Sequence, residues 1–250
     1  MNPTQHSCIA VVTARGGSKR IPHKNLVKIN GISLVARTLK TAVDSKLFTH
    51  IILSSDSDLI LKEAAKFKTV IAIKRSPQLA SDTAKSMDVL LDLLNNPLFK
   101  KTESLCLLQP TSPFRTTKHL KESWQKFSSS TADSLVSVAP VVTNPFHMVV
   151  AKSKSGASHL EPLLGAKIFA FRTQDTPEIY ALNGAIYFAT AKKLKKDKSF
   201  IGRKALVYKM SLRDSLDIDE PQDLKLARRL LSPQGRKVVT NTKKTKRNLK

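Results

Sequence analysis

A glycine-rich, cationic turn near the N-terminus is the first segment whose residues could do chemistry. It reads TARGGSKRIPHKN over residues 13–25 and follows a short apolar run. Gly16 and Gly17 allow a tight turn, in which successive backbone N–H groups can hold phosphate oxygens. Arg15, Lys19 and Lys24 add positive charge around such a group. The P-loop and dinucleotide patterns do not match. The turn therefore reads either as a phosphate site or as a surface turn with solvated lysines.

An acidic couplet near the C-terminal end is the second such segment. Asp217 and Asp219 are two positions apart in SLDID, residues 215–219, so on an extended chain both carboxylates point to one face. Paired carboxylates are suitable ligands for Mg²⁺, which takes its other positions from water and phosphate. The alternative is a helix N-terminus enriched in acids, with Asp219 as its cap.

A polar ledge forms the third segment, in LLQPTSPFR over residues 107–115. An amide, two hydroxyls and a guanidinium follow an apolar run there, and two prolines fix the backbone between them. Such a rigid surface suits recognition of a sugar or a base. An ordinary turn at the end of a strand is the alternative interpretation.

The segments that must position these motifs alternate between strand and helix patterns. Short apolar runs predict strands at 8–12, 50–53, 70–73, 105–108, 132–138, 185–189 and 205–210. Helical spacing predicts helices at 33–43, 58–67, 86–94, 116–127 and 220–231. This order predicts an α/β fold, a mostly parallel sheet with helices on both faces. Ligands of such sheets bind beyond the carboxyl ends of the strands.

The pattern divides the chain into one domain over residues 1–231 and a tail over 232–250. From 140 to 177 no clear period is visible, which predicts an irregular insertion at about 140–180, either a lid or an arm that packs on a partner subunit. The tail carries seven basic residues and no acid, a composition typical of disorder.

Composition limits the function classes. No apolar run approaches the roughly 18 residues of a membrane span, and residues 1–12 lack a signal-peptide pattern. Cys8 and Cys106 lie in apolar runs, where we expect reduced, buried thiols and hence a cytoplasmic protein. The formal charge of +24 suits an anionic substrate. We do not expect nucleic-acid binding as the main function, because aromatic residues make up only 6%.

Five motifs in this order resemble the acylneuraminate cytidylyltransferase family over about residues 9–230. They are ARGGSK at 14–19 with KN at 24–25, LASDTA at 79–84, LQPTSP at 108–113, NGAIY at 183–187, and DID at 217–219. The resemblance implies a Rossmann-like fold of the nucleotide-diphospho-sugar transferase type. It also implies a homodimer formed through the insertion, and an enzyme that activates a sugar for surface glycans such as lipopolysaccharide or capsule.

The same resemblance implies roles for individual residues. The first turn would wrap the CTP phosphates with Arg15, Gly16, Gly17, Ser18, Lys19 and Lys24. Cytidine would be recognised by Asn25, Ala84 and Ser86, and the acidic sugar by Gln109, Asn183, Tyr187 and Phe200. Asp217 and Asp219 would bind Mg²⁺ and, with Arg15, Lys19 and Lys24, promote catalysis. The anomeric hydroxyl would attack the α-phosphorus of CTP and release pyrophosphate, with a carboxylate or metal-bound water as proton acceptor.

The sequence departs from the family pattern only where the sugar is expected. Ala181 stands where many members carry Arg, and Phe146-His147 follows Asn144-Pro145 where Lys or an aromatic is common. The substrate could thus be N-acetylneuraminate, legionaminate or another nonulosonate, and the run at 81–84 favours that branch. A cytidylyltransferase for KDO or pseudaminate is the alternative. A protein of another class, binding RNA or an acidic membrane through its tail without catalysis, is the second.

Overall fold

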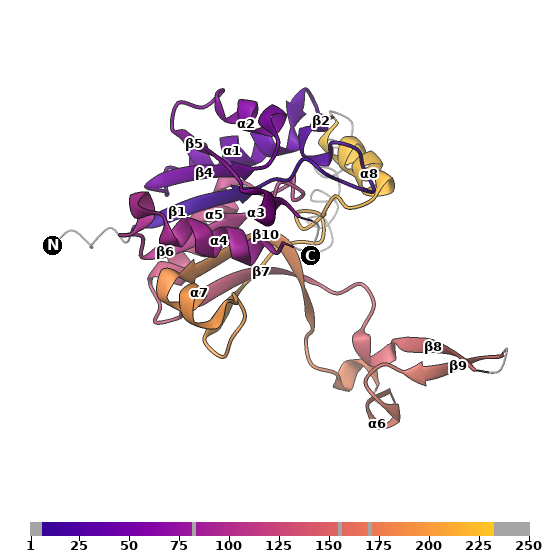
Figure 1. The fold of residues 1–250 in the computed structure, drawn as a ribbon. Helices are drawn as coiled ribbons and strands as arrows, with labels where there is room; N and C mark the ends of the chain where they lie inside the picture. The colour runs from indigo at the N-terminus through magenta and orange to yellow at the C-terminus, as the bar shows by residue number, and fades with distance from the viewer. Residues whose placement is uncertain (1–6, 82–83, 155–156, 170–171, 233–250) are drawn as a thin grey trace, which may run out of the picture.

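The computed structural model describes residues 7–81, 84–154, 157–169 and 172–232. A seven-stranded sheet in the order β11-β7-β10-β6-β1-β4-β5 forms its centre (Figure 1). The strands are β1 Cys8–Thr13, β4 His50–Ser55, β5 Val70–Lys74, β6 Ser104–Leu108, β7 Ser134–Pro140, β10 Tyr180–Thr190 and β11 Ala205–Lys209. Within this sheet only β10 runs antiparallel to its neighbours. The predicted mostly parallel α/β sheet is confirmed.

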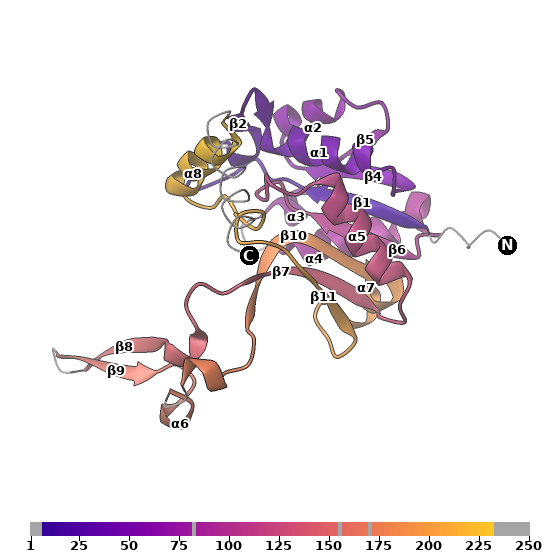
Figure 2. The same cartoon turned by 180° about the vertical axis from the view of Figure 1, so that it is seen from behind.

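Helices cover both faces of the sheet, because its central strands are apolar on both sides. Alternate residues of β1 enter two different cores: Cys8, Ala10 and Val12 one, Ile9 and Val11 the other. The first core is closed by α1 Leu34–Ser45, α2 Asp58–Ala64 and α5 Thr117–Ser128. The second is closed by α4 Ser86–Asn95 and α7 Ala191–Asp197 (Figures 1 and 2).

The predicted elements are present, and the additional ones are short. The β2–β3 hairpin has two residues in each strand, Lys28–Ile29 and Ile32–Ser33, and α3 spans Pro77–Ala80. Segments of this length carry too few residues for a periodic pattern. Helix α7 was missed for another reason: it is rich in lysine and buries only Lys193 and Leu194. Cys8 and Cys106 are buried free thiols, as expected.

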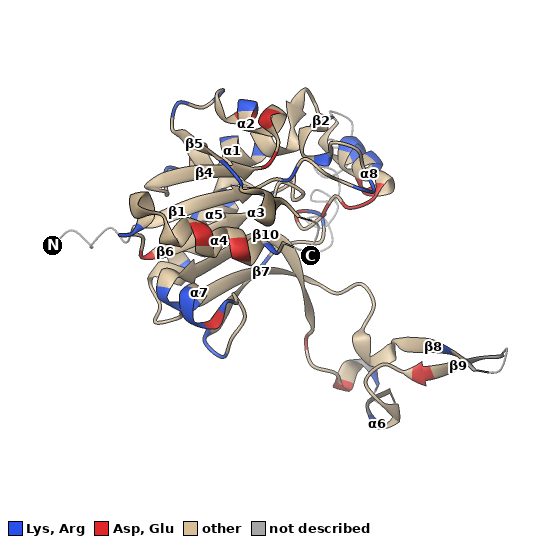
Figure 3. Cartoon of the chain, in the orientation of Figure 1, with Lys and Arg blue, Asp and Glu red and all other residues tan. Residues whose placement is uncertain are grey.

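The insertion is more regular than predicted. Residues 141–179, which we call the arm, contain an antiparallel hairpin of β8 Val149–Lys154 and β9 Ala157–Pro162, followed by α6 Ala166–Phe169. The hairpin stands away from the central sheet (Figure 1), and most of its described residues are uncharged (Figure 3). Its described residues bury no apolar face, so the alternation that reveals a half-buried strand is absent. The basic tail lies, apart from Ser232, outside the described residues.

A third, smaller core joins the turn after β1 to the acidic segment and to helix α8. It contains Ile21 of the first turn, Ile29 and Leu34 beside it, Phe114 of the ledge, Ile218 between the two acids, and Ala227 of α8. Helix α8, Pro221–Leu231, therefore packs beside β2, as both ribbon views show. No helix among the described residues is long and apolar enough to cross a membrane.

Candidate active site at the carboxyl ends of the strands

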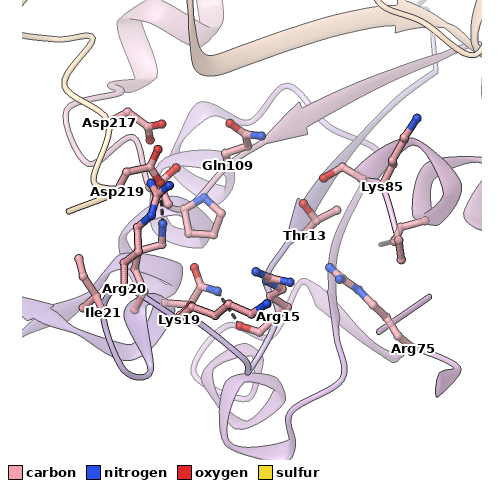
Figure 4. A pocket seen from close by; sticks show the side chains of 18 residues that line it. Thr13, Arg15, Lys19, Arg20, Ile21, Arg75, Lys85, Gln109, Asp217 and Asp219 are labelled. Atoms are coloured by element: carbon pink, nitrogen blue, oxygen red, sulfur yellow. Dashed lines mark hydrogen bonds and ion pairs between the residues drawn. The ribbon is translucent and has the colours of Figure 1, made fainter. Parts of the chain in front are cut away.

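A cleft of about 610 Å³ opens where the parallel strands end. The turn after β1, the residue after β5, the ledge after β6 and the segment after β11 all contribute to it (Figure 4). Its lining residues are Thr13, Arg15, Ser18, Lys19, Arg20, Ile21, Lys24, Asn25, Arg75, Ala84, Lys85, Ser86, Val89, Gln109, Pro110, Thr111, Asp217 and Asp219. The three motifs identified in the sequence thus meet in one cleft, which we call the first cleft.

The cationic turn and the acidic couplet are in direct contact. Lys24 Nζ lies 2.8 Å from Asp219 Oδ1. The couplet is also fixed to the ledge, because the Ile218 N–H donates to the Thr111 carbonyl at 2.9 Å. These two contacts hold the acids beside the cationic turn.

The acid that caps helix α8 is not Asp219. Glu220 occupies the N-cap position, and the carboxylate of Asp223 accepts the N–H groups of Asp219 and Glu220 at 3.0 and 2.7 Å. The capping interpretation of Asp219 therefore does not hold, and its carboxylate is left to face the cleft.

Asp217 is the most perturbed acid of the cleft. Burial raises its pKa, as do the charges of Asp219 and Asp223, whereas Thr111 and Lys24 lower it. Its Oδ1 atom is buried and has no hydrogen-bond partner. An orphaned carboxylate oxygen beside a second carboxylate fits a divalent cation. No group of three or more His, Cys, Asp or Glu gathers among the described residues, so water or ligand oxygens would complete the coordination of Mg²⁺.

The glycines determine the shape of the turn and do not line the first cleft. The Gly16 N–H donates to Asp56 Oδ1 at 2.8 Å, so it points to Asp56 instead of to a phosphate. A Cβ on Gly16 would lie 2.9 Å from Ser57 Cβ, closer than side chains pack. Neither Gly16 nor Gly17 is among the residues that line the first cleft. The structure thus corrects the expected backbone cradle at Gly16: the glycine lets the turn lie against the end of β4.

Asn25 closes the same turn from inside. It is 6% exposed, and its Nδ2 donates to the Arg15 carbonyl at 2.9 Å. Ala84 and Ser86 line the cleft. Ala84 ends the motif at 79–84, of which residues 82–83 lie outside the described residues.

Arg75 is a cleft residue that the sequence reasoning missed. Its Nε donates to Ser54 Oγ at 3.0 Å and its second terminal nitrogen to the Ser54 carbonyl at 2.8 Å. Burial lowers its pKa, Asp56 raises it, and Arg15 lowers it. Its place directly after the predicted strand at 70–73 was the available signal, because the loops after strands form the ligand edge of such a sheet.

A second pocket of about 560 Å³ adjoins the first cleft. Gln109 and Asp217 line both. The other residues of its wall are Ala139, Pro140, Val141, Val142, Thr143, Met148, Ala181, Leu182, Asn183, Gly184, Tyr187, Leu212 and Ser215. Gln109, Asn183 and Tyr187, three of the residues predicted to contact one ligand, are thereby brought together.

Asn183 lines this pocket, but its amide is used within the protein. Its Nδ2 donates to Ser215 Oγ at 2.8 Å, and its Oδ1 accepts from Ser137 Oγ at 2.6 Å and from the Ala185 N–H at 3.1 Å. The side chain thus joins β7, β10 and the acidic segment. We interpret it as a brace for that segment, where the resemblance implied a ligand contact.

A bulge in β10 aims its residues at the pocket. The register with β7 shifts between Leu182 and Tyr187. Gly184 within it has φ +72°, and a Cβ there would lie 2.4 Å from Gln109 Oε1. The positive φ favours glycine here, and the absence of a Cβ leaves room for the Gln109 amide beside the bulge.

Phe200 lies behind the pocket wall. It is 8% exposed and lines neither the first cleft nor the second pocket. Its ring centroid is 5.3 Å from that of Tyr187. Burial and the charge of Asp217 raise the pKa of Tyr187. Phe200 therefore supports Tyr187 from the core, and does not reach the ligand space as the resemblance implied. His23 lines neither site.

Comparison with known proteins adds a family and close relatives. A sequence model of the family described as Cytidylyltransferase matches residues 9–245. The CMP-N,N'-diacetyllegionaminic acid synthase of Legionella pneumophila is 34% identical over 229 residues, 89% of this chain and 95% of the relative. An N-acylneuraminate cytidylyltransferase of Streptococcus agalactiae is 31% identical over 217 residues, 86% of this chain. The chain spans about half, 51%, of that relative's length.

Solved structures show the same fold at low identity. CMP:2-keto-3-deoxy-manno-octonic acid synthetase in complex with CTP superposes with a TM-score of 0.66 at 14% identity, covering 90% of this chain and 98% of the other. A 4-diphosphocytidyl-2C-methyl-D-erythritol synthase gives a TM-score of 0.64 at 14% identity, covering 91% and 99%. These superpositions support the fold described above, a mostly parallel sheet covered by helices on both faces.

The buried acid predicts a gain of stability on its neutralisation. Since burial raises the pKa of Asp217, the folded chain holds this proton more tightly than the unfolded chain, and stability falls as pH rises from about 3.9 through the folded value. Asp217→Asn has no charge to bury. Without divalent cations, we expect it to melt above the wild type at neutral pH, by about 2–4 °C per kcal/mol relieved. The difference should close in acid, and an unchanged melting curve across pH would contradict the buried charge.

The brace predicts a structural cost for losing the Asn183 amide. Asn183→Ala removes a hydrogen-bond partner from the buried Ser137 hydroxyl and Ala185 N–H and from the half-buried Ser215, at about 1–3 kcal/mol for each buried group. We expect the free energy of unfolding in urea to fall by about 2–4 kcal/mol. Asn95→Ala, on the exposed side of α4, is the matched control, with an expected change within about 0.5 kcal/mol. A change as small at Asn183 would refute the brace.

Proposed function

The chain belongs to the cytidylyltransferase family, and from this premise we propose that it transfers CMP from CTP to the anomeric hydroxyl of an acidic nonulosonic sugar. Pyrophosphate is the other product, and Mg²⁺ held by Asp217 and Asp219 is required. The observation that carries the proposal is the contact of Lys24 with Asp219 at 2.8 Å. It supports the proposal because an ammonium group that could bind a phosphate and a carboxylate that could bind a metal ion meet in one cleft.

The first cleft suits the triphosphate of CTP. Arg15, Lys19, Lys24 and Arg75 line it, and guanidinium groups bind phosphate oxygens in a bidentate manner. A cationic cleft also raises the local concentration of polyanions. Asn25, Ala84 and Ser86 on its walls are the candidates for reading the cytidine.

The second pocket suits the sugar. It meets the first cleft at Gln109 and Asp217, so a sugar bound there has its reacting end beside the nucleotide. Two relatives that cover 86% and 89% of this chain are named for N-acylneuraminate and diacetyllegionaminic acid. The synthetase for 2-keto-3-deoxy-manno-octonic acid shares only 14% identity. These observations favour a nonulosonate over KDO as the substrate.

The residues act by positioning and by electrostatics. In-line attack on the α-phosphorus builds negative charge on the phosphoryl and leaving oxygens, which fixed cations stabilise. Lys24 and Arg15 face that charge from the turn, while Gln109 at the border of both sites orients the sugar. Mg²⁺, when bound, would neutralise the phosphates and help to align them. The contact of Ile218 with Thr111 keeps both acids at the cleft throughout.

Replacing the exposed acid tests the proposal. Asp219→Asn removes one anionic ligand from the metal site, and we expect turnover of CTP with N-acetylneuraminate or legionaminate to fall by about 10²–10⁴-fold, a loss typical of catalytic electrostatics. Pyrophosphate release in Mg²⁺ is the measurement. Asp214→Asn is the matched control: it is three residues before Asp217 and lines neither site. Near-normal turnover in Asp219→Asn would remove the metal role, and no pyrophosphate from the wild type with any such sugar would refute the function.

We further propose that the arm mediates a homodimer. Its hairpin and the following residues expose large apolar side chains, among them Val149 at 44%, Leu160 at 72% and Leu164 at 45%. An exposed apolar set on a projecting element is typical of a protein interface. The sheet domain itself has two complete cores, so the arm is not needed to close it.

The arm can be tested by charge insertion. Leu160→Lys together with Leu164→Lys should convert a dimer to a monomer, since lysine is depleted from interface cores. Analytical ultracentrifugation reports the halved mass. Leu98→Lys, at an exposed site on the sheet domain, should leave the mass unchanged. A wild type that sediments as a monomer would refute the proposal directly.

A further inference from the structure

Arg115 ends the polar ledge, and its guanidinium is turned into the core instead of toward a ligand. The residue is 4% exposed and lines neither the first cleft nor the second pocket. Among the described residues no carboxylate contributes to its pKa, which burial lowers to about 10, so the group stays charged at neutral pH. Burying a cation without an opposite charge costs free energy. The groups to which this cation donates therefore indicate its role.

The guanidinium joins three elements of the fold. One terminal nitrogen, Nη1, donates to the Gln109 carbonyl at 3.1 Å and to the Ala185 carbonyl at 2.7 Å. The other, Nη2, donates to Thr38 Oγ1 at 2.9 Å. Gln109 follows β6, Ala185 lies in β10 and Thr38 lies in α1. A planar fork with fixed N–H directions can serve such separate acceptors at the same time.

The two carbonyls belong to strands whose pairing stops just before them. Strands β6 and β10 pair antiparallel as far as Leu107 and Tyr187. Two residues further along that register, Gln109 would lie opposite Ala185. Nη1 of Arg115 bridges these two residues, where the ladder no longer joins them. The guanidinium thus holds the strands together at the point where they separate.

This point is also where the two sites meet. Gln109 and Asp217 line both the first cleft and the second pocket. Gly184, which precedes Ala185, lies so near the Gln109 amide that a Cβ on it would be 2.4 Å from Gln109 Oε1. A shift of either carbonyl that Arg115 holds would therefore change the space left for this amide.

We propose that Arg115 is a positioning residue: from the core it holds Gln109 at the border of the two sites, and so determines how the sugar is placed for attack on CTP. The inference rests on the proposed function, in which Gln109 orients the sugar. The phosphate side of the first cleft is held by other contacts, from Asp56 to the cationic turn and from Ser54 to Arg75. Loss of the guanidinium should therefore affect use of the sugar far more than binding of CTP.

Arg115→Met tests the role, because methionine fills the core without any N–H donor. The full-length enzyme is assayed with CTP, Mg²⁺ and either N-acetylneuraminate or legionaminate, whichever the wild type turns over faster, and rates are normalised to the folded fraction. We expect kcat/KM for the sugar to fall by about 30- to 100-fold, and KM for CTP to change by less than about threefold. Phe127→Leu, buried in the first core, is the matched control for lost stability and should alter neither constant. Equal losses for the sugar and CTP, or no loss, would overturn the inference.

A double-mutant cycle separates positioning through Gln109 from general packing. If Arg115 acts through Gln109, the double variant Arg115→Met/Gln109→Ala should lose no more kcat/KM for the sugar than Gln109→Ala alone. Additive losses beside a normally active wild type would refute this inference and leave the proposed function standing. A wild type that turns over neither sugar refutes both.

Thr38→Val decides the matter if Arg115→Met does not fold. It leaves Arg115 in place and removes the acceptor of Nη2, so the fork is free to shift. We expect a loss of roughly threefold or more in kcat/KM for the sugar, with KM for CTP unchanged. An unchanged kcat/KM in this variant would then count against the inference.

Discussion

The contact between Lys24 and Asp219 connects residues 195 positions apart in the sequence, and the geometry of the site follows from it. Six cationic side chains line one cleft, and like charges at this density repel one another; they are Arg15, Lys19, Arg20, Lys24, Arg75 and Lys85. Two acids opposite them reduce that repulsion. The apolar packing of Ile218 and the hydrogen bond from its N–H to Thr111 hold the acids there. Opposite charge accounts for the pairing of Lys24 with Asp219, and the packing of Ile218 determines where the two side chains meet.

This arrangement places unusual requirements on three residues of the site. Asp217 keeps a buried, unpartnered oxygen, Gly16 must stay small to lie against Ser57, and Gly184 takes a left-handed conformation against Gln109. The unpartnered oxygen costs stability, and each glycine restricts its position to a residue without a Cβ. Each also fixes a group that a cation, a phosphate or a sugar would contact. These requirements therefore lie where the proposed chemistry takes place.

Much of this could be predicted from the sequence, for identifiable reasons. Strands buried on both faces, such as 8–12 and 105–108, are visible in the sequence as apolar runs. Ligands of such sheets bind at the loops that follow the strands, and this rule identified the turn, the ledge and the acids. Side-chain partners could not be predicted. The resemblance marks Asn183 and Phe200 as ligand contacts, yet the Asn183 amide is hydrogen-bonded internally and Phe200 packs in the core. Arg75 and Asp56 come from outside every motif. The arm's hairpin left no trace because none of its described faces is buried.

The distance along the chain between the turn and the acids has a consequence for biosynthesis. The ribosome releases the cationic turn with the first strand, whereas its counter-charges follow β11, the last strand to be made. A fragment that ends before residue 217 would lack Asp217 and Asp219, and with them the metal site that we propose. Until Asp219 has been synthesised, Lys24 lacks the carboxylate that it contacts in the folded chain.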